Sequence, residues 1–279
     1  MKLCTFVNQE GQECVGLVKD NKICRLSGYK DMIELIQKYD SDKIEYDLKE
    51  AEDCFSLEEV SLMAPVTNPR KMIFVGFNYR DHAKESKSAI PEFPVLFSKF
   101  SNSLIGNNQN VIIPQVVKKC DFEAELAFVI GKTAKNVDID DAMEYVFGYT
   151  ICNDVSARDL QLRVSQWLSG KAIDTFAPMG PVIATADEIG DPHNLDISCR
   201  VNGVLRQKSN TRELIFNIPF LISYISRTLT LEPGDIISTG TPQGVILGSE
   251  DPVWLKEGDV CEIEVENIGV LRNVFVYEK

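Results

Sequence analysis

The sequence predicts an α+β fold that is mainly β, with a small N-terminal α+β domain over residues 1–65 and a larger domain over residues 66–279. Short strand candidates dominate the second half of the chain, around residues 181–184, 196–201, 235–239, 260–265 and 270–277. They do not alternate regularly with helical segments, which argues against a doubly wound sheet or a TIM barrel. The proline-bearing stretch Ala64-Pro-Val-Thr-Asn-Pro69 reads as a linker, because proline favours extended backbone.

The N-terminal part has the pattern of three short strands followed by a helix. Its strand candidates are residues 4–7, 13–18 and 22–26, which Gly and Asn residues separate. Residues 31–39 carry apolar side chains at helical spacing. This part is therefore expected to form a small unit separate from the rest of the chain.

The larger part begins with a buried strand candidate, residues 71–77. A short polar helix is expected over residues 80–88, followed by an extended stretch around Pro91 and Pro94. The pattern then predicts a strand over 122–130 and a helix from Asp140 to Gly148. A strand over 149–154 is expected to run into a helix that begins near Asp154 or Ser156. A last helix is expected over 211–225, with a kink or an end at Pro219.

The charge balance argues against two classes of partner. The chain has 29 basic and 42 acidic residues, a formal net charge of −13. An electrostatic nucleic-acid binder needs a basic face, and an anionic membrane surface attracts basic segments. No apolar run reaches the roughly 18 residues of a membrane span. The first residues become polar too early for a signal peptide. We therefore expect neither a nucleic-acid nor a membrane partner.

The cysteines and histidines restrict the kinds of site the chain can build. None of the eight cysteines forms a Cys-x-x-Cys pair, so a zinc ribbon or a thioredoxin motif is not expected. Scattered thiols without a secretion signal favour reduced, mostly buried cysteines and a cytoplasmic location. Only two histidines are present, His82 and His193, so a metal site must depend on carboxylates. Oxygen ligands select hard cations such as Mg²⁺, Mn²⁺ or Ca²⁺.

Three acidic residues precede an apolar strand. In Asp121-Phe-Glu123-Ala-Glu125, alternate residues share one face of a strand, about 7 Å apart by strand rise. The apolar continuation through Ile130 carries this strand toward the core, and Asp154 follows the next strand candidate. Converging buried carboxylates either rise in pKa or bind a cation. The alternative is an edge strand with a solvated acidic face.

Other polar side chains stand near this group in the predicted order of elements. On a helix, Asp154, Arg158 and Gln161 would project from one face, although an N-capped helix with an ordinary ion pair explains them equally well. His82 and Glu85 are three residues apart, a spacing that suits an oriented base or a loose surface pair.

Two further segments carry single polar candidates. Lys171 lies amid apolar and turn residues and could stabilise developing negative charge. Thr241 lies in a tight loop after a strand that could present donors to an anion or be a simple hairpin loop.

Taken together and in this order, these segments resemble the fumarylacetoacetate hydrolase family, in particular its short bacterial-type members. The resemblance spans about residues 70–277 and rests on Val75-Gly-Phe-Asn-Tyr-Arg-Asp-His82, Asp121-Phe-Glu-Ala-Glu-Leu126, Gly148-Tyr-Thr-Ile-Cys-Asn-Asp-Val-Ser-Ala-Arg-Asp159, Lys171-Ala-Ile-Asp-Thr-Phe-Ala-Pro-Met-Gly-Pro181, Val201-Asn-Gly203 and Gly234-Asp-Ile-Ile-Ser-Thr-Gly-Thr-Pro-Gln-Gly-Val245. Residues 1–65 match only loosely, as a variable N-terminal domain.

The resemblance implies a mixed β-sandwich roll around a divalent cation, most often Mg²⁺, and a homodimer. The implied roles are metal ligation by Glu123, Glu125 and Asp154, catalysis by His82, Glu85 and Lys171, and substrate binding by Arg158, Gln161, Thr241 and Tyr79. Asp121 is not among the implied ligands, and Lys99 lies in a family-like segment without an assigned role.

The implied function is metal-dependent hydrolysis of a carbon–carbon bond in a small anionic diketo or acylpyruvate-type 2-oxo acid, as in aromatic catabolism. The metal would stabilise an enolate, and His82 with Glu85 would activate water. Two alternatives use the same site: a decarboxylase of the oxaloacetate type, or an isomerase of the 2-hydroxy-hepta-2,4-diene-1,7-dioate type. A non-enzymatic, metal-stabilised binding protein is a weaker third alternative.

Overall fold

The computed structural model describes residues 1–49, 53–81 and 90–279. Its N-terminal elements are β1 (Lys2–Val7), β2 (Glu13–Lys19), β3 (Lys22–Arg25), α1 (Met32–Gln37), α2 (Ser41–Lys49), β4 (Cys54–Ser56) and β5 (Ser61–Leu62). Asp31 caps α1 by accepting a hydrogen bond from the backbone N–H of Glu34. The helix therefore begins where the helical spacing of apolar residues begins, and the expected strand–strand–strand–helix order is confirmed.

The rest of the described chain is also richer in strands than in helices. Its strands are β6 (Met72–Gly76), β7 (Val95–Ser98), β8 (Leu104–Ile105), β9 (Asn110–Ile113), β10 (Cys120–Asp121), β11 (Ala124–Ile130), β12 (Val146–Asn153), β13 (Ser156–Ala157), β14 (Ala177–Thr185), β15 (Asp196–Val201), β16 (Val204–Asn210), β17 (Ile236–Ser238), β18 (Val260–Val265) and β19 (Gly269–Tyr277). Its helices are α4 (Arg158–Gln161), α5 (Leu168–Lys171), α6 (Ala186–Ile189) and α7 (Ile218–Ser226), with 3₁₀ turns η1 (Ser101–Ser103), η2 (Ala142–Tyr145), η3 (Thr211–Glu213) and η4 (Ile246–Gly248).

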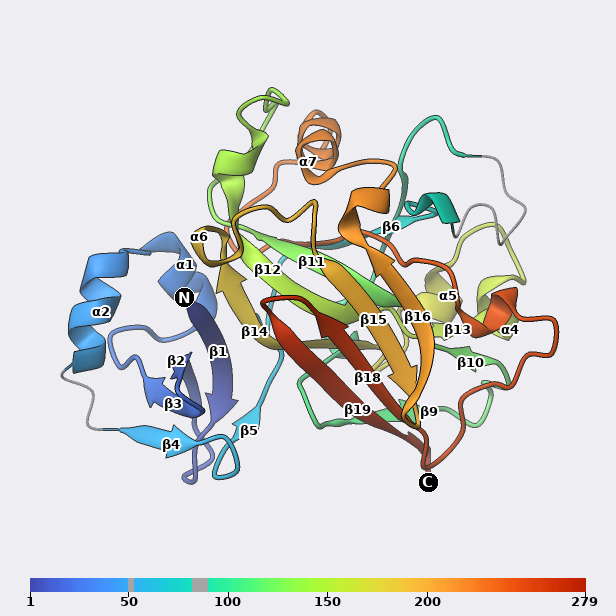
Figure 1. The fold of residues 1–279 in the computed structure, drawn as a ribbon, viewed down its shortest axis with the longest axis horizontal. Helices are drawn as coiled ribbons and strands as arrows, with labels where there is room; N and C mark the ends of the chain where they lie inside the picture. The colour runs from blue at the N-terminus through green and yellow to red at the C-terminus, as the bar shows by residue number, and fades with distance from the viewer. Residues whose placement is uncertain (50–52, 82–89) are drawn as a thin grey trace.

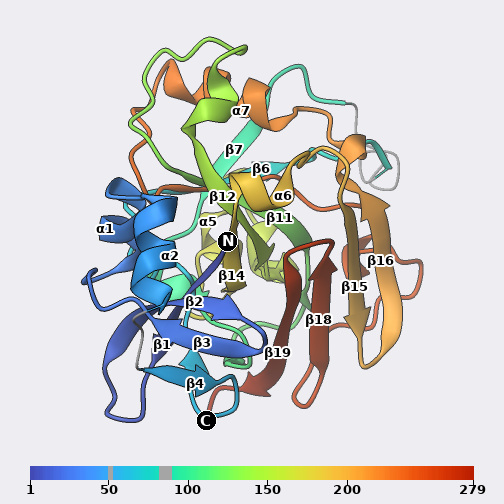
Figure 2. The ribbon, with the colours of Figure 1, turned by 60° about the vertical axis from the view of Figure 1, so that its left-hand side comes forward.

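The described strands form three sheets. The largest has the order β4-β3-β2-β1-β14-β12-β11-β17-β6-β7, with β5 beside β1 and β8 beside β14. A five-stranded sheet, β16-β15-β18-β19-β9, packs against the β11, β12 and β14 region, and β10 pairs with β13 (Figures 1 and 2). The prediction of a mainly β fold with mixed sheets is confirmed.

The central strand β11 is buried along its whole length. It pairs with β12 on one side and with β17 on the other. Leu126 and Phe128 pack into one apolar cluster, and Ala127 and Val129 pack into a second cluster on the opposite face. Glu125 within β11, and Asp121 and Glu123 just before it, are buried as well. These acidic residues are therefore held inside the molecule.

The large sheet continues through the N-terminal part. Lys2 and Leu3 of β1 pair with Ala184 and Ile183 of β14, so backbone hydrogen bonds join residues 1–65 to the larger part. Figure 1 shows these N-terminal elements, in blue, at one side of the molecule. Whether residues 1–65 and 66–279 fold independently stays a prediction.

Two helix predictions were wrong in their extent. The segment from Asp140 forms only the turn η2 and then enters β12, which contains Gly148, because β12 is needed between β11 and β14. The segment from Thr211 forms η3, and α7 begins only at Ile218. Asn217 caps α7 and Pro219 lies in its first turn, where the missing N–H of proline costs nothing.

The expectation of reduced cysteines holds for six of the eight. Cys24 and Cys54 form a disulfide, whereas Cys4, Cys14, Cys120, Cys152, Cys199 and Cys261 are free and buried. The two bonded residues lie directly opposite each other on the paired strands β3 and β4. The two cysteines are 30 residues apart in the chain, so the sequence did not predict this disulfide. The register between β3 and β4 brings them together.

No helix in the described ranges is both long and apolar enough to cross a bilayer.

Candidate metal centre

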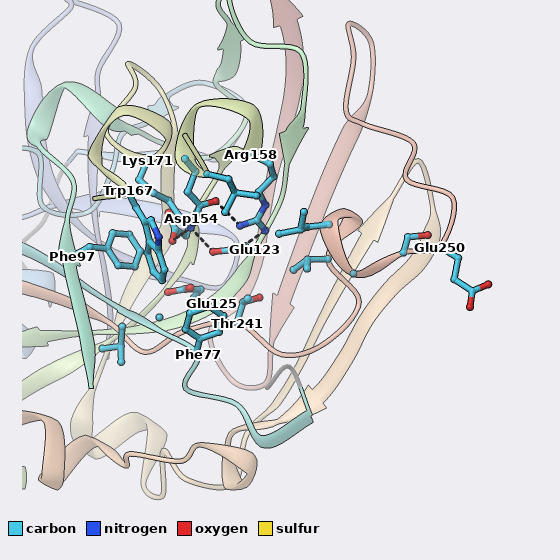
Figure 3. A pocket seen from close by; sticks show the side chains of 18 residues that line it. Phe77, Phe97, Glu123, Glu125, Asp154, Arg158, Trp167, Lys171, Thr241 and Glu250 are labelled. Carbon is cyan, nitrogen blue, oxygen red and sulfur yellow. Dashed lines mark hydrogen bonds and ion pairs between the residues drawn. The ribbon is translucent and has the colours of Figure 1, made fainter. Parts of the chain in front are cut away.

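A cavity of about 580 Å³ opens where β11 begins and β12 ends. Seven of the predicted site residues line it: Glu123, Glu125, Asp154, Arg158, Gln161, Lys171 and Thr241. Figure 3 shows the labelled side chains of Glu123, Glu125, Asp154, Arg158 and Lys171 converging on one region of the cavity wall. The volume lies in the range of roughly 300–1,000 Å³ that small-molecule sites occupy.

Strand pairing brings the three predicted metal ligands together. Ala124 of β11 lies opposite Asn153 of β12. Glu123 precedes Ala124 and Asp154 follows Asn153, so these two residues meet at the same end of the sheet. The backbone N–H of Asp154 donates to the carbonyl oxygen of Glu123 at 2.9 Å. One oxygen from each of Glu123, Glu125 and Asp154 lies within 4.8 Å of the others, and all three residues are buried. The solvated edge strand considered as an alternative is therefore excluded.

Arg158 is held between two carboxylates. Its guanidinium lies 2.8 Å from Asp121 Oδ2 and 2.7 Å from Glu123 Oε1, and its Nη1 donates to Gln161 Oε1 at 3.0 Å. Burial alone would lower the pKa of Arg158, but the negative charges of Glu123 and Asp121 outweigh burial and raise it. The guanidinium is thus a fixed positive charge at the cavity wall.

Asp121, which the family resemblance left outside the ligand set, organises this wall. Besides its contacts with Arg158, it accepts hydrogen bonds from the backbone N–H groups of Ile246 and Leu247, at 2.8 and 3.0 Å. The carboxylate thereby ties η4, whose residues line the cavity, to the guanidinium. Asp121 is a positioning residue, consistent with its absence from the implied ligands.

Two buried lysines complete the charge arrangement around Asp154. Lys171 Nζ lies 2.7 Å from Glu123 Oε2 and 2.6 Å from Asp154 Oδ2. Lys99 Nζ lies 2.6 Å from Asp154 Oδ1 and donates to the carbonyl oxygens of Val155 and Phe176, at 2.8 and 2.5 Å. Burial lowers the pKa of both amines. The negative charges of Asp154 and Glu123 reverse this for Lys171, whose pKa is raised, whereas the pKa of Lys99 stays lowered.

These contacts form one chain of alternating charges. Its order is Asp121, Arg158, Glu123, Lys171, Asp154, Lys99, three carboxylates and three cations joined by the ion pairs above. The chain is neutral as a whole. Buried charges are tolerated in this form because each one faces an opposite charge at contact distance.

Glu125 is the exception. Its Oε2 accepts hydrogen bonds from the Ser238 hydroxyl and, at 3.1 Å, from the backbone N–H of Gly240. No lysine or arginine of the described chain forms an ion pair with it. Burial raises its pKa well above 4.5, and the nearby carboxylates of Asp154 and Glu123 raise it further. A proton or a cation must neutralise this charge, and three converging carboxylates suit a hard divalent cation.

The helix predicted from Asp154 was wrong in its start. Residues Ser156 and Ala157 form β13 and pair with Asp121 and Cys120 of β10, so the backbone stays extended and α4 begins only at Arg158. Asp154 therefore reaches the cavity from the end of a strand and not from a helix face.

Close packing of α4 and α5 sets the place of Lys171. A Cβ atom on Gly170 would lie 2.4 Å from the backbone nitrogen of Gln161, so only glycine permits this approach. The contact brings Lys171, the last residue of α5, beside the α4 residues Arg158 and Gln161. Sequence spacing did not reveal this role of glycine.

The other four predicted residues have different outcomes. Thr241 lines the cavity, and its Oγ1 accepts a hydrogen bond from Gln207 Nε2 at 2.9 Å. Tyr79 was expected to bind substrate, but it is fully buried and does not line the cavity. The neighbouring Asn78 hydrogen-bonds the backbone of Phe216 and the carbonyl oxygen of Thr239, and the substrate-binding role of Tyr79 stays a prediction. His82 and Glu85 lie outside the described residues.

The sequence places Lys99 in a family-like segment without an assigned role, and it does not reveal several residues that line the cavity. Phe77, Phe97 and Trp167 form an aromatic wall. These three come from separate segments, so no local pattern in the sequence groups them.

The unpaired charge of Glu125 predicts a pH-dependent stability. The folded state binds the Glu125 proton more tightly than the unfolded state, so this contribution is complete below pH 4.5 and is lost as pH rises toward the raised folded pKa. We expect Glu125→Gln, in EDTA, to exceed the wild type in unfolding free energy by on the order of 1 kcal/mol at pH 8. The difference should shrink toward pH 5. Urea unfolding from pH 5 to pH 8 measures it, and a Glu125→Gln protein less stable at pH 8 would contradict the assignment.

The contacts of Lys99 predict a large effect of its removal. Lys99→Met deletes a buried charge and leaves one oxygen of Asp154 unpaired, so we expect a loss of about 3–5 kcal/mol in unfolding free energy. Lys208→Met, at an exposed position, is the matched control and should change stability by less than about 0.5 kcal/mol. Chemical denaturation of the two variants makes the comparison. Equal small losses would show that Lys99 carries no structural charge balance.

Comparison with known proteins agrees with this geometry. Residues 71–276 match the family model described as fumarylacetoacetate (FAA) hydrolase C-terminal. A mitochondrial oxaloacetate tautomerase of Rattus norvegicus is 49% identical over 219 residues, which cover 78% of this chain and 70% of the relative. The structure of a fumarylacetoacetate hydrolase from Exiguobacterium antarcticum matches with a TM-score of 0.89 and 37% identity, over 100% of both chains.

A second solved structure bears on the cavity. It is a maleylpyruvate hydrolase from a Sphingobium species in complex with manganese(II) ion and pyruvate, with a TM-score of 0.84 and 34% identity over 100% of both chains. The match to the family model covers most of the chain, and the fold and the carboxylate cluster agree with it. This chain belongs to the fumarylacetoacetate hydrolase family.

Proposed function

We propose that this protein is a divalent-cation-dependent hydrolase that cleaves a carbon–carbon bond in a small diketo or acylpyruvate-type 2-oxo acid. One observation carries the proposal. Three buried carboxylates converge at the inner end of a cavity large enough for such an acid, and one of them, Glu125, lacks a cationic partner among the described residues. The neutral chain of six charged side chains and Glu125 together carry one net negative charge, and a bound dication would change it to one net positive charge, which suits an anionic ligand.

The relatives support the substrate class. The rat relative is an oxaloacetate tautomerase, and the Sphingobium structure is a maleylpyruvate hydrolase with manganese(II) and pyruvate bound. Both names refer to small 2-oxo acids. They support an enzyme of oxo-acid chemistry, while the type of reaction is our proposal.

Glu123, Glu125 and Asp154 would hold the cation, Mg²⁺ in the first place and Mn²⁺ or Ca²⁺ as alternatives. Their donor atoms are all carboxylate oxygens, and all three side chains are buried. When bound, such a cation supplies Lewis acidity toward the carbonyl oxygens of a 2-oxo acid. Fixed ligands of this kind reduce the reorganisation required during the reaction.

The polar side chains of the cavity would bind and polarise the substrate. Arg158 offers a fixed guanidinium and Thr241 a hydroxyl that can donate to a substrate oxygen. Gln161 lies beside Arg158 and can bind the same substrate carboxylate as the guanidinium. Lys171 presents an ammonium that can stabilise the negative charge that develops on the pyruvate unit when the carbon–carbon bond breaks.

The hydrolytic step requires a base for water. We propose that His82, oriented by Glu85, takes the proton, a role drawn from their spacing in the sequence. The water oxygen bonds to the distal carbonyl carbon, and the bond from that carbon to the methylene group breaks. The electron pair passes to the 2-oxo acid unit, whose methylene carbon then takes a proton. The products are a carboxylate and pyruvate.

Tautomerisation or decarboxylation of oxaloacetate is the second candidate. The rat relative favours it by name, and the cation with Lys171 can stabilise an enolate without attack by water. An isomerase that only shifts a proton along a hydroxymuconate-type diacid needs no water attack either. A binding protein without activity stays the third alternative.

Replacing His82 separates hydrolysis from decarboxylation. We expect His82→Ala to lower the rate of acylpyruvate hydrolysis by about 100-fold or more, because water loses its base. Decarboxylation of oxaloacetate should survive, since it needs no water attack. Pyruvate formation from each substrate by wild type and variant measures both rates. Unchanged hydrolysis in His82→Ala would contradict the proposed base.

Removal of the cation tests the metal site. EDTA should abolish turnover of 2-oxo acids, and Mg²⁺ or Mn²⁺ should restore it. Asp154→Asn should weaken binding of Mn²⁺, followed by electron paramagnetic resonance, whereas Asp174→Asn in the same region of the chain should not. Full activity in EDTA would exclude a cation-dependent mechanism, and no turnover of any 2-oxo acid with Mg²⁺ would favour the binding protein.

The finer expectations remain proposals. A homodimer, a part in aromatic catabolism and a cytoplasmic location rest on the sequence alone. The cytoplasmic expectation assumed that all cysteines are reduced, whereas Cys24 and Cys54 form a disulfide. The rat relative is mitochondrial by name.

A further inference from the structure

The cavity has a charged inner end and an apolar outer part. The carboxylates, Arg158 and Lys171 occupy the inner end, whereas aromatic side chains line one side of the outer part. The Trp167 ring lies 5.5 Å from the Phe77 ring and 5.4 Å from the Phe97 ring, edge to face in both pairs. Figure 3 shows Phe97 and Trp167 side by side next to the carboxylates.

The Trp167 ring is held in place by more than these two contacts. A Cβ atom on Gly76 would lie 2.6 Å from Trp167 Cζ3, so the indole rests directly on the backbone of β6. A ring that packs against two aromatic neighbours and a strand loses little further freedom when a ligand binds. Trp167 therefore forms a rigid wall of the outer cavity.

Among residues 1–49, 53–81 and 90–279, the cavity lining offers no unpaired basic side chain for a second negative charge. Among the described residues that line the cavity, the basic ones are Arg158 and Lys171, and both already face buried carboxylates. The charged residue at the opposite side of the opening is Glu250, which is acidic (Figure 3). A carboxylate in the tail of a substrate would lose hydration there without gaining an ion pair.

We propose that the substrate carries an uncharged, apolar tail that packs against Trp167, and that Trp167 determines this specificity. The proposal rests on the proposed function for the 2-oxo acid head. The proposed substrate differs from oxaloacetate and maleylpyruvate, the acids in the names of the relatives, because both of these acids carry a second carboxylate.

Binding of three 2-oxo acids to the Mg²⁺-loaded protein, measured by calorimetry, tests the proposal. Pyruvate probes the head alone, phenylpyruvate adds an apolar ring, and 2-oxoglutarate adds a carboxylate tail. We expect phenylpyruvate to bind at least about tenfold more tightly than pyruvate, because apolar groups in a fitted pocket contribute at this level. 2-Oxoglutarate should bind no more tightly than pyruvate.

Two variants test whether Trp167 causes the tighter binding of phenylpyruvate. Trp167→Ala removes the ring, and Gly76→Ala displaces it from its seat on β6. Both should bring the ratio of phenylpyruvate to pyruvate affinity down to about one, and circular dichroism shows whether they are folded. Val164→Ala is the matched control, since Val164 is exposed in the same segment and does not line the cavity.

The outcomes separate the two proposals. If pyruvate binds and phenylpyruvate gains nothing, or if 2-oxoglutarate gains as much, the apolar-tail proposal is overturned and the proposed function stands. If the advantage of phenylpyruvate survives in Trp167→Ala, the assignment to Trp167 is overturned. If none of the three acids binds, the proposed function fails and the tail proposal fails with it.

Discussion

The compensation of buried charge at the inner end of the cavity is the constraint on which the rest of the site depends. Three carboxylates and three cations alternate from Asp121 to Lys99, and each ion pair in that chain fixes the next side chain. Glu125 stands outside this chain of pairs. The protein thus maintains an interior position where negative charge is in excess. Such a position costs stability when empty and gains interaction energy when a cation occupies it.

The fold supplies the rigidity that this arrangement requires. β11 is buried on both faces and paired on both edges, so Glu123 and Glu125 reach the cavity from a fully buried part of the sheet. β12 delivers Asp154 to the same end through its register with β11. The cationic side chains of Arg158 and Lys171 come from shorter segments, α4 and α5, which pack closely at Gly170. Fixed acids and separately positioned cations allow the site to bind an ion without moving the sheet.

Some parts of the structure could be predicted because the signal was local. The strand predicted over 122–130, with its acidic residues Glu123 and Glu125, follows from alternation and an apolar run, and the structure has it as β11. The strands of the N-terminal part follow from short apolar segments between turns. Other parts failed for a physical reason that local patterns do not contain. Pairing of β13 with β10 overrode the helix expected to begin near Asp154 or Ser156, and pairing of β12 with β11 and β14 overrode the helix expected from Asp140 to Gly148.

By itself, the sequence determined which atoms can form the site and in which order the chain delivers them. Two histidines and acidic residues beside apolar strands leave carboxylate oxygen as the donor, and oxygen donors select a hard cation. Only the tertiary structure decided how those charges are balanced. Lys99, Asp121 and Trp167 acquire their roles through contacts with residues far away in the chain, and the pKa of Glu125 depends on burial and on Asp154 and Glu123 beside it. Distances between charges and their exclusion from water exist only after folding, so no linear pattern could reveal them.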